Sequence, residues 1–181
     1  MSEPVALLDV DVPMYAAGRD HPYKEACVWV MTEVAEGRLG VAIDTEVIQE
    51  ILYRYGQLQE WEIATTLATG LFDLVPVVYP VSKADARMAV ELFKQYAPQG
   101  IKARDLIHVA VMRSHGLTRI ISTDRHFDRI AGVERVDPNA LWSHAHHGSG
   151  GGSHAAGGRG PTPTMVAEAA PTPPLRMIGY E

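Results

Sequence analysis

Short apolar runs alternate with longer amphipathic stretches over most of this chain. The runs are bounded by charged or turn-forming residues, and runs of this length in such a setting are typical of buried strands. Four runs are predicted strands, and a less apolar fifth is a candidate last strand. In chain order they are Val5–Leu8, Gly40–Ile43, Val75–Tyr79, Arg119–Ser122 and Glu134–Val136.

The stretches between these runs place apolar residues at the three- and four-residue spacing of helices. Asp44 or Thr45 is suited to cap one of them, and Ser82 with Asp85 forms a predicted capping box at another. The predicted helices are Glu25–Glu36, Thr45–Tyr55, Glu60–Phe72, Ser82–Tyr96, Arg104–His115 and a short one at His126–Ile130.

Strands that alternate with helices favour parallel pairing, because each helix returns the chain to the same end of the sheet. We therefore predict a three-layer α/β/α fold. Helices cover both faces of a central parallel sheet of four to five strands. No internal repeat is present in the sequence.

The composition changes after Trp142. Residues 148–160 are dominated by Gly, Ser, Ala and His, and five prolines follow between positions 161 and 174. Such a segment buries too little apolar area to offset the entropy lost on ordering. We predict one folded domain over residues 1–142 and a disordered Gly/Pro-rich tail over residues 143–181. We expect no fixed metal site from the histidines of this tail, which are His144, His146, His147 and His154.

With 46% hydrophobic and 21% charged residues, the chain of 181 residues has the composition of an ordinary globular protein. Its apolar runs are too short to cross a bilayer, and its first residues lack the positive charge of a secretory signal. The single cysteine, Cys27, excludes an internal disulfide and lies in an apolar helical stretch, which favours core packing over a reactive thiol. These features predict a cytoplasmic protein that makes no membrane contact.

The net charge of −6 argues against general coating of nucleic acid, but the charge is unevenly distributed. Up to residue 101 the chain has 7 basic and 15 acidic side chains, whereas residues 102–135 have 7 basic and 4 acidic ones. A local basic surface on an acidic protein suits a selective contact with RNA. A solvated helix face with mixed charge explains the same pattern.

Two acidic residues lie at the carboxyl ends of predicted strands. Asp9 ends the run Val5–Leu8, and Asp124 closely follows Arg119–Ser122. In parallel sheets, ligands bind beyond the carboxyl ends of the strands, so both carboxylates are expected at the functional edge.

Two further acids lie on predicted helices beside that edge. Glu50 lies between Val47 and Ile51, at the margin of a buried stripe, where a side chain can reach over the edge of the sheet. Asp105 lies in the first turn of its helix, before the apolar positions. Taken singly, these acids also fit ordinary places at a strand end, on the surface or at a helix cap.

Four carboxylates at one edge repel one another unless a cation neutralises them. With oxygen ligands only, the expected cation is Mg²⁺, with Mn²⁺ as the second choice. The chemistry that such a site favours is hydrolysis of a phosphodiester.

Four segments resemble the motifs of the PIN-domain family in their order. The first is a strand that ends in Asp9 and leads into a short helix, Leu8-Asp9-Val10-Asp11-Val12-Pro13-Met14-Tyr15-Ala16. The others are Val47-Ile48-Gln49-Glu50-Ile51-Leu52, Ala103-Arg104-Asp105-Leu106-Ile107-His108-Val109-Ala110 and Ile121-Ser122-Thr123-Asp124-Arg125-His126-Phe127-Asp128. The resemblance covers residues 5 to about 137, and within the family it is to VapC-type toxins of bacterial toxin–antitoxin pairs.

This resemblance implies a metal-dependent endoribonuclease that hydrolyses RNA phosphodiester bonds. It also implies a homodimer that is held inactive by a small antitoxin, whose C-terminal segment covers the acidic site. The catalytic acids it implies are Asp9, Glu50, Asp105 and Asp124. Of these, Asp9, Asp105 and Asp124 are the implied ligands of the metal.

Supporting roles follow for several neighbours. Asp11 stands where many relatives have Asn, and Asp128 is a candidate fifth acid. The hydroxyl of Thr123 is suited to hold an acid or a water. Basic side chains beside the acids are suited either to meet RNA phosphates or to balance the acidic cluster, and they are Arg104, Arg125, His126 and Arg129.

Two other functions remain open at this stage. The segment Asp9-Val10-Asp11-Val12 also fits a haloacid-dehalogenase-like phosphatase, with Asp9 as nucleophile and Asp11 as general acid. That hypothesis leaves Glu50 and Asp105 without roles. The other alternative is a catalytically silent PIN-like module that only binds RNA or a protein.

Overall fold

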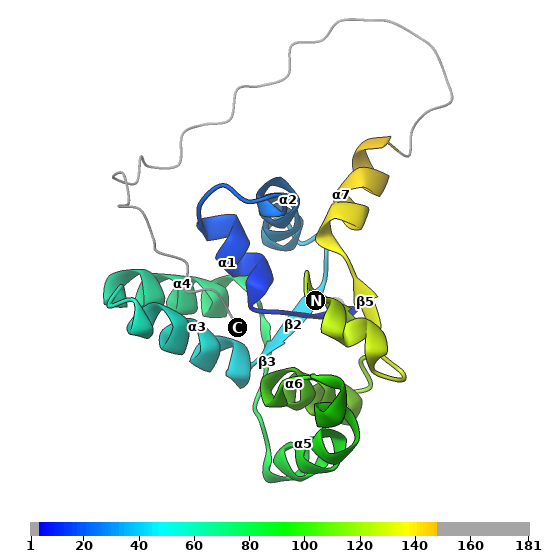
Figure 1. Cartoon of the computed structure of the whole chain (residues 1–181). Helices are drawn as coiled ribbons and strands as arrows, with labels where there is room; N and C mark the ends of the chain where they lie inside the picture. Colours follow the sequence, from blue (N-terminus) through cyan, green and yellow to red (C-terminus); the bar gives the residue numbers. More distant parts are fainter. Residues whose placement is uncertain (1–3, 148–181) are drawn as a thin grey trace, which may run out of the picture.

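The computed structural model of the chain describes residues 4–147. It contains one five-stranded sheet with the strand order β3-β2-β1-β4-β5, and every neighbouring pair is parallel (Figure 1). The prediction of a three-layer fold with a central parallel sheet is confirmed. The strands are β1 (Ala6–Leu8), β2 (Val41–Asp44), β3 (Val77–Tyr79), β4 (Arg119–Ile121) and β5 (Glu134–Val136).

Helices cover both faces of this sheet. The helices α1 (Asp11–Ala17), α2 (Lys24–Ala35), α3 (Thr45–Gln57) and α4 (Trp61–Leu74) pack on one face. The other face is covered by α5 (Lys83–Tyr96) and α6 (Ala103–Ser114), which lie together in Figure 1. The short 3₁₀ segments are η1 (Ala97–Gln99) and η2 (Arg125–Arg129).

The strands divide the core into two clusters because successive side chains of a strand point to opposite faces. In β1, Ala6 and Leu8 belong to the cluster under α1–α4, whereas Leu7 belongs to the cluster under α5 and α6. Cys27 is buried in the first cluster and unpaired. Burial raises the pKa of its thiol to about 12, which fits core packing.

A seventh α-helix, α7 (Pro138–His147), was not predicted. Pro138 begins it, because the fixed φ of proline suits the first helical turn. It packs against α2, where the ring of His146 lies edge-on to Trp29 at 6.0 Å. The helix passes through the predicted domain boundary at residue 142. Three of the four tail histidines therefore lie on a helix, and His154 lies outside the described residues.

No helix of residues 4–147 combines the length and the apolar character that a bilayer crossing requires. The pairing register aligns the ends of the three central strands, with Leu8 opposite Ile121 in β4. The residues that follow these ends, and the last residue of β2, therefore lie along one edge of the sheet. They include Asp9, Asp44 and Ser122.

Candidate active site

Asp9 occupies the centre of this edge, immediately after β1. Its side chain is buried, and its oxygens accept hydrogen bonds from the backbone N–H of Val10 (2.8 Å) and the hydroxyl of Ser122 (2.5 Å). The pKa of Asp9 is raised to about 6, chiefly by burial and in part by the nearby carboxylates of Glu50 and Asp105, while His108 and the hydroxyl of Ser122 act in the opposite direction. The surroundings of Asp9 therefore favour the neutral form of its carboxyl group.

Ser122 connects the ends of β1 and β4, a role that sequence reasoning missed. Its side chain is fully buried, and its hydroxyl donates to Asp9. The same oxygen accepts the backbone N–H of Asp124 at 2.9 Å. The only signal in the sequence was a serine between an apolar strand and an acid.

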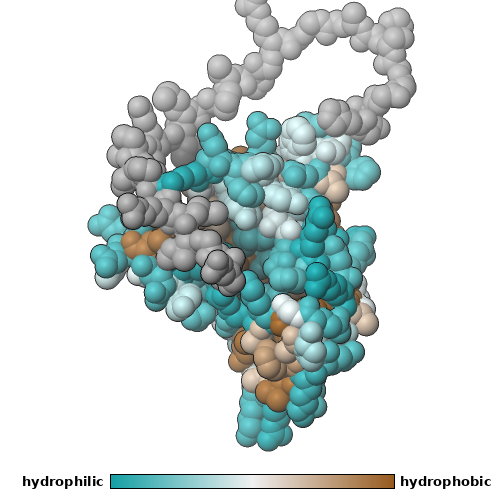
Figure 2. All heavy atoms as spheres, viewed as in Figure 1, coloured by the Kyte–Doolittle hydropathy of each residue, from teal (hydrophilic) through white to brown (hydrophobic). Residues whose placement is uncertain are grey.

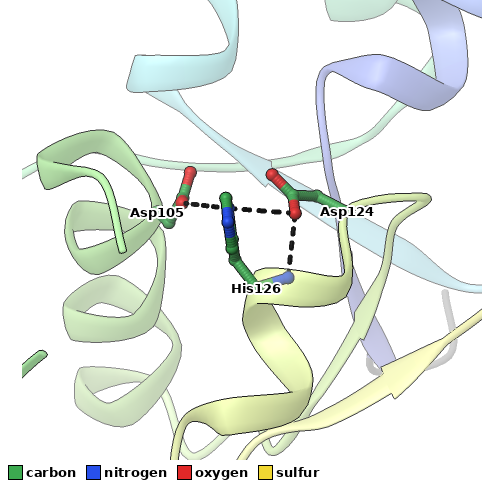
Figure 3. Close-up of side chains that lie close together, drawn as sticks. All are labelled: Asp105, Asp124 and His126. Carbon is green, nitrogen blue, oxygen red and sulfur yellow. Dashed lines mark hydrogen bonds and ion pairs between the residues drawn. The ribbon is translucent and has the colours of Figure 1, made fainter. Parts of the chain in front are cut away.

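Asp105 and Asp124 come together from α6 and from the loop after β4 (Figure 3). His126, from η2, lies between them: its Nδ1 is 3.2 Å from Asp124 Oδ1 and 3.8 Å from Asp105 Oδ2. Ligand atoms from all three residues lie within 4.8 Å of one another. Burial raises the pKa of Asp105, and the adjacent carboxylate of Asp124 raises it further. His126 therefore joins the acids that the sequence predicted.

Glu50 projects from α3 and is 3% exposed, which is unusual for a carboxylate. It pairs with the guanidinium groups of Arg54, one turn later on α3, and of Arg104 at 3.0 Å. Arg104 also lies over the ring of Tyr53, 5.9 Å from its centroid. Of the two roles predicted for Arg104, charge balance of the acidic cluster is the one that this arrangement displays.

Asp11 belongs to the same cluster. Its Oδ2 accepts the backbone N–H of Thr123 at 2.9 Å and also the hydroxyl of Thr123. Its Oδ1 is buried without a hydrogen-bond partner among the described residues. Burial raises the pKa of Asp11 well above its usual value, and the adjacent Asp9 adds to this effect. The hydroxyl of Thr123 therefore binds Asp11 and none of the four predicted catalytic acids.

A buried histidine lies behind Asp9, and its place was also missed. His108 of α6 is 1% exposed, and its Nδ1 lies 2.8 Å from Asp44 Oδ2 at the end of β2. Its Nε2 faces Asp9 Oδ1 at 4.0 Å. Burial by itself lowers the pKa of His108, but Asp44 and Asp9 outweigh that effect and raise it to about 10. His108 is thus a buried imidazole between two buried acids, which favour its protonated form.

The remaining predicted residues have partners outside the cluster. The Nε of Arg135 donates a hydrogen bond to Asp128 Oδ1 at 2.9 Å, and Arg135 also donates to the backbone oxygen of Ser122 at 3.0 Å. Arg129 donates to the backbone oxygen of Gln99 at 2.9 Å. The structure therefore does not bring Asp128 or Arg129 into the acidic group.

The residues at the edge of the sheet fit a divalent cation. Three of the carboxyl groups, those of Asp9, Asp11 and Asp105, have raised pKa values because they are buried close to one another. A cation bound among them relieves that repulsion and favours their charged forms. Carboxylate oxygens are the ligands that Mg²⁺ prefers, and the imidazole of His126 also suits Mn²⁺.

Comparison with known sequences identifies relatives of the folded region. A family profile of the PIN domain matches residues 6–133. The chain is similar to ribonuclease VapC13 of Mycobacterium tuberculosis, with 33% identity over 130 residues, 72% of this chain and 98% of the relative. It is also similar to ribonuclease VapC23 of the same species, with 32% identity over 120 residues, 65% of this chain and 90% of the relative.

Solved structures share the fold at lower identity. VapBC2 of Rickettsia felis, bound to a DNA fragment of its promoter, aligns with a TM-score of 0.58 and 15% identity over 73% of this chain and 97% of its own. VapC20 of Mycobacterium tuberculosis, a toxin that cleaves the sarcin–ricin loop, aligns with a TM-score of 0.57 and 15% identity over 66% and 90%. The profile match spans nearly all of the sheet and its acidic edge, so this chain belongs to the PIN-domain family.

Proposed function

We propose that this protein is a Mg²⁺-dependent endoribonuclease and the toxin of a toxin–antitoxin pair. The observation that supports it most strongly is the cluster of Asp105, Asp124 and His126 at the carboxyl edge of the sheet, with the buried carboxyl group of Asp9 near Asp105. This cluster occurs in a chain that is 33% identical to a protein named as a ribonuclease. Membership of the PIN family favours this function over the phosphatase hypothesis.

Asp9, Asp105 and Asp124 would hold the metal, with His126 beside the last two. A bound divalent cation supplies positive charge that stabilises the negative charge developing on the phosphate and on the leaving oxygen. Around it, Ser122 orients Asp9, and the two arginines that pair with Glu50 fix that carboxylate at the edge of the site.

RNA is the proposed substrate because basic side chains lie on the elements that contain or directly follow the acids. Arg104 lies beside Glu50, and Arg125 and Arg129 lie on η2, directly after Asp124. In this proposal they bind phosphates on either side of the bond that is cut, so they position the strand without selecting its sequence. In hydrolysis, a water oxygen bonds to phosphorus while the bond to the ribose oxygen breaks.

The proposed protein partners are a second copy of the chain and a small antitoxin. Figure 2 shows apolar surface at the end of the molecule formed by α5 and α6 and at the edge formed by α3 and α4. On α5, Val90 and Phe93 are 57% and 46% exposed, and on α4, Trp61 is 54% exposed. Exposed apolar groups of this size favour protein contacts. The proposed location of the complex is the cytoplasm.

Incubation of the purified protein with total RNA, with Mg²⁺ or with EDTA, tests the proposal. We expect cleavage only with Mg²⁺ and its loss in Asp9→Asn, Glu50→Gln, Asp105→Asn and Asp124→Asn, each still folded. The matched control is Asp73→Asn, which neutralises an exposed acid on α4. Wild-type rates in two or more of the four variants would overturn the proposed site. RNA binding without any cleavage would instead support the silent module.

A further inference from the structure

The imidazole of His108 is buried behind the proposed site, and each of its nitrogens faces a different acid. Nδ1 lies 2.8 Å from Asp44, and Nε2 lies 4.0 Å from Asp9 and makes no hydrogen bond with the described residues. Buried polar atoms normally have partners, so an unbonded nitrogen aimed at a proposed metal ligand calls for an explanation.

Asp44 also caps a helix, and this gives the bond between Asp44 and His108 Nδ1 a structural purpose. Asp44 is the last residue of β2 and caps α3, because its Oδ1 accepts the backbone N–H of Val47 at 3.2 Å. The bond from His108 to its other oxygen therefore connects α6 to the start of α3. These two helices contain Asp105 and Glu50, respectively.

The second nitrogen has no such structural task. Asp9 is already held by Val10, directly before α1, and by Ser122, directly after β4. His108 approaches the same carboxylate from a third element, α6, one turn beyond Asp105. A histidine that served only to satisfy Asp44 would not need its free nitrogen directed at Asp9.

We propose that His108 is a positioning residue whose two nitrogens have separate tasks: Nδ1 binds Asp44 and stabilises the fold, and Nε2 orients Asp9 for the divalent metal. The inference rests on the proposed metal-dependent function. It assigns part of the site's metal affinity to a side chain that does not touch the metal.

Two conservative substitutions separate the tasks. The amide of Asn places a donor near the position of Nδ1, and the longer amide of Gln places one near Nε2. His108→Asn should keep the bond to Asp44 and lose the approach to Asp9. His108→Gln should do the reverse.

Mn²⁺ binding measured by calorimetry and thermal unfolding of the metal-free full chain give the two readouts. For His108→Asn we expect the smaller fall in melting temperature of the two variants and a dissociation constant for Mn²⁺ raised roughly tenfold. For His108→Gln we expect the melting temperature to fall by roughly 5 °C or more, with metal affinity within about threefold of the wild type.

Equal Mn²⁺ affinity in wild type and both variants would overturn the inference and leave His108 with a structural role alone. If a variant does not fold, the wild type provides the test: the ¹⁵N resonance of His108 Nε2 should move when Mg²⁺ is added, and an unmoved signal would overturn the inference. A wild type that binds neither metal overturns the proposed function itself, and the inference with it.

Discussion

Asp85 and Asp9 are both buried carboxyl groups, yet their surroundings affect ionisation in opposite directions. Asp85, on α5, is 2% exposed and accepts hydrogen bonds from the backbone N–H of Ser82 (2.8 Å), the hydroxyl of Ser82 (2.6 Å) and the hydroxyl of Ser114. Burial alone raises its pKa, but these donors outweigh burial and lower it below the usual value. Asp85 is a structural acid that joins α5 to α6.

Asp9 is 6% exposed and also accepts two hydrogen bonds, but it shares its surroundings with other carboxylates. Its pKa is raised to about 6, and the pKa of the neighbouring Asp11 is raised well above its usual value. Depth of burial therefore does not distinguish the two regions. The proposed active site is marked by acids placed close together, an arrangement that is unfavourable without a cation.

The largest expected effect is on catalysis. Asp9→Asn removes a proposed metal ligand, so we expect RNA cleavage to fall by at least roughly a hundredfold. The metal-free protein should be as stable as the wild type or more stable, because the amide has no charge to bury. Initial rates with a labelled RNA and unfolding curves in EDTA measure the two quantities. An Asp9→Asn variant that is both active and destabilised would contradict the comparison, because that is the behaviour of a structural acid such as Asp85.

The converse substitution, Asp85→Asn, should affect stability and spare catalysis. The amide leaves hydroxyl and N–H donors of Ser82 and Ser114 without their charged acceptor, and this should reduce the free energy of unfolding by roughly 2–3 kcal/mol. Urea unfolding in EDTA measures the loss, and cleavage at a temperature where the variant is fully folded is the control. Lost cleavage in the folded variant would show that α5 belongs to the site.

The pH dependence of stability should separate the two acids further. The folded-state pKa of Asp9 is raised from 3.8 to about 6, so its favourable contribution is complete below pH 3.8 and is lost as the pH rises through 6. The stability of Asp9→Asn relative to the wild type should therefore increase between about pH 4 and pH 7 in EDTA. For Asp85, whose pKa is lowered, stability is lost as the pH falls. Denaturant unfolding at several pH values checks both signs, and equal pH profiles would contradict the comparison.

Asp11→Asn should have a smaller effect. The raised pKa of Asp11 favours its neutral form, and an amide oxygen can still accept the N–H and hydroxyl of Thr123. We expect RNA cleavage to change by less than roughly tenfold, about 1.4 kcal/mol in the activation barrier. The phosphatase hypothesis makes Asp11 a general acid and predicts a loss of roughly a hundredfold or more. Wild-type hydrolysis of a small phosphomonoester, lost in Asp11→Asn, would favour the phosphatase.

The smallest effect is expected from deleting residues 148–181, whose Gly/Pro-rich composition predicts little buried area. Melting temperature and cleavage should stay close to those of the full chain. A deletion from Pro138 is the matched comparison, and it should destabilise the domain because it removes α7 from α2. A large loss of stability or of cleavage in the shorter deletion would show that the tail contributes to the domain.

The strands and most helices could be predicted because each has a local signal, and so could the places of the four acids in these elements. Asp9 follows an apolar run, and Asp105 lies in the first turn of a periodic helix. The helix α7 lacked such a signal, because Pro138 and the glycine-rich sequence beyond it resembled the end of a domain.

The contacts within the site could not be predicted from local sequence patterns, because their partners are far apart in the chain. Asp44 and His108 are 64 residues apart, and each has an ordinary explanation in its own segment, as a helix cap and as a position on a buried helix face. Ser122 likewise reads as the last residue of a strand. Only the packing of α6 and β4 against β1 and β2 brings these side chains together.

The pairing of β1 with β4 affects when a newly made chain can act. Ser122 and Asp9 are 113 residues apart, so the ribosome has synthesised almost the whole sheet before this contact can form. Asp9 and Glu50 emerge early, yet they stay without Asp105 and Asp124 until β4 docks beside β1. Long-range parallel pairing is also slow to form. For the proposed nuclease, this order of assembly means that the acidic edge is complete only after β4 has been synthesised and has paired with β1.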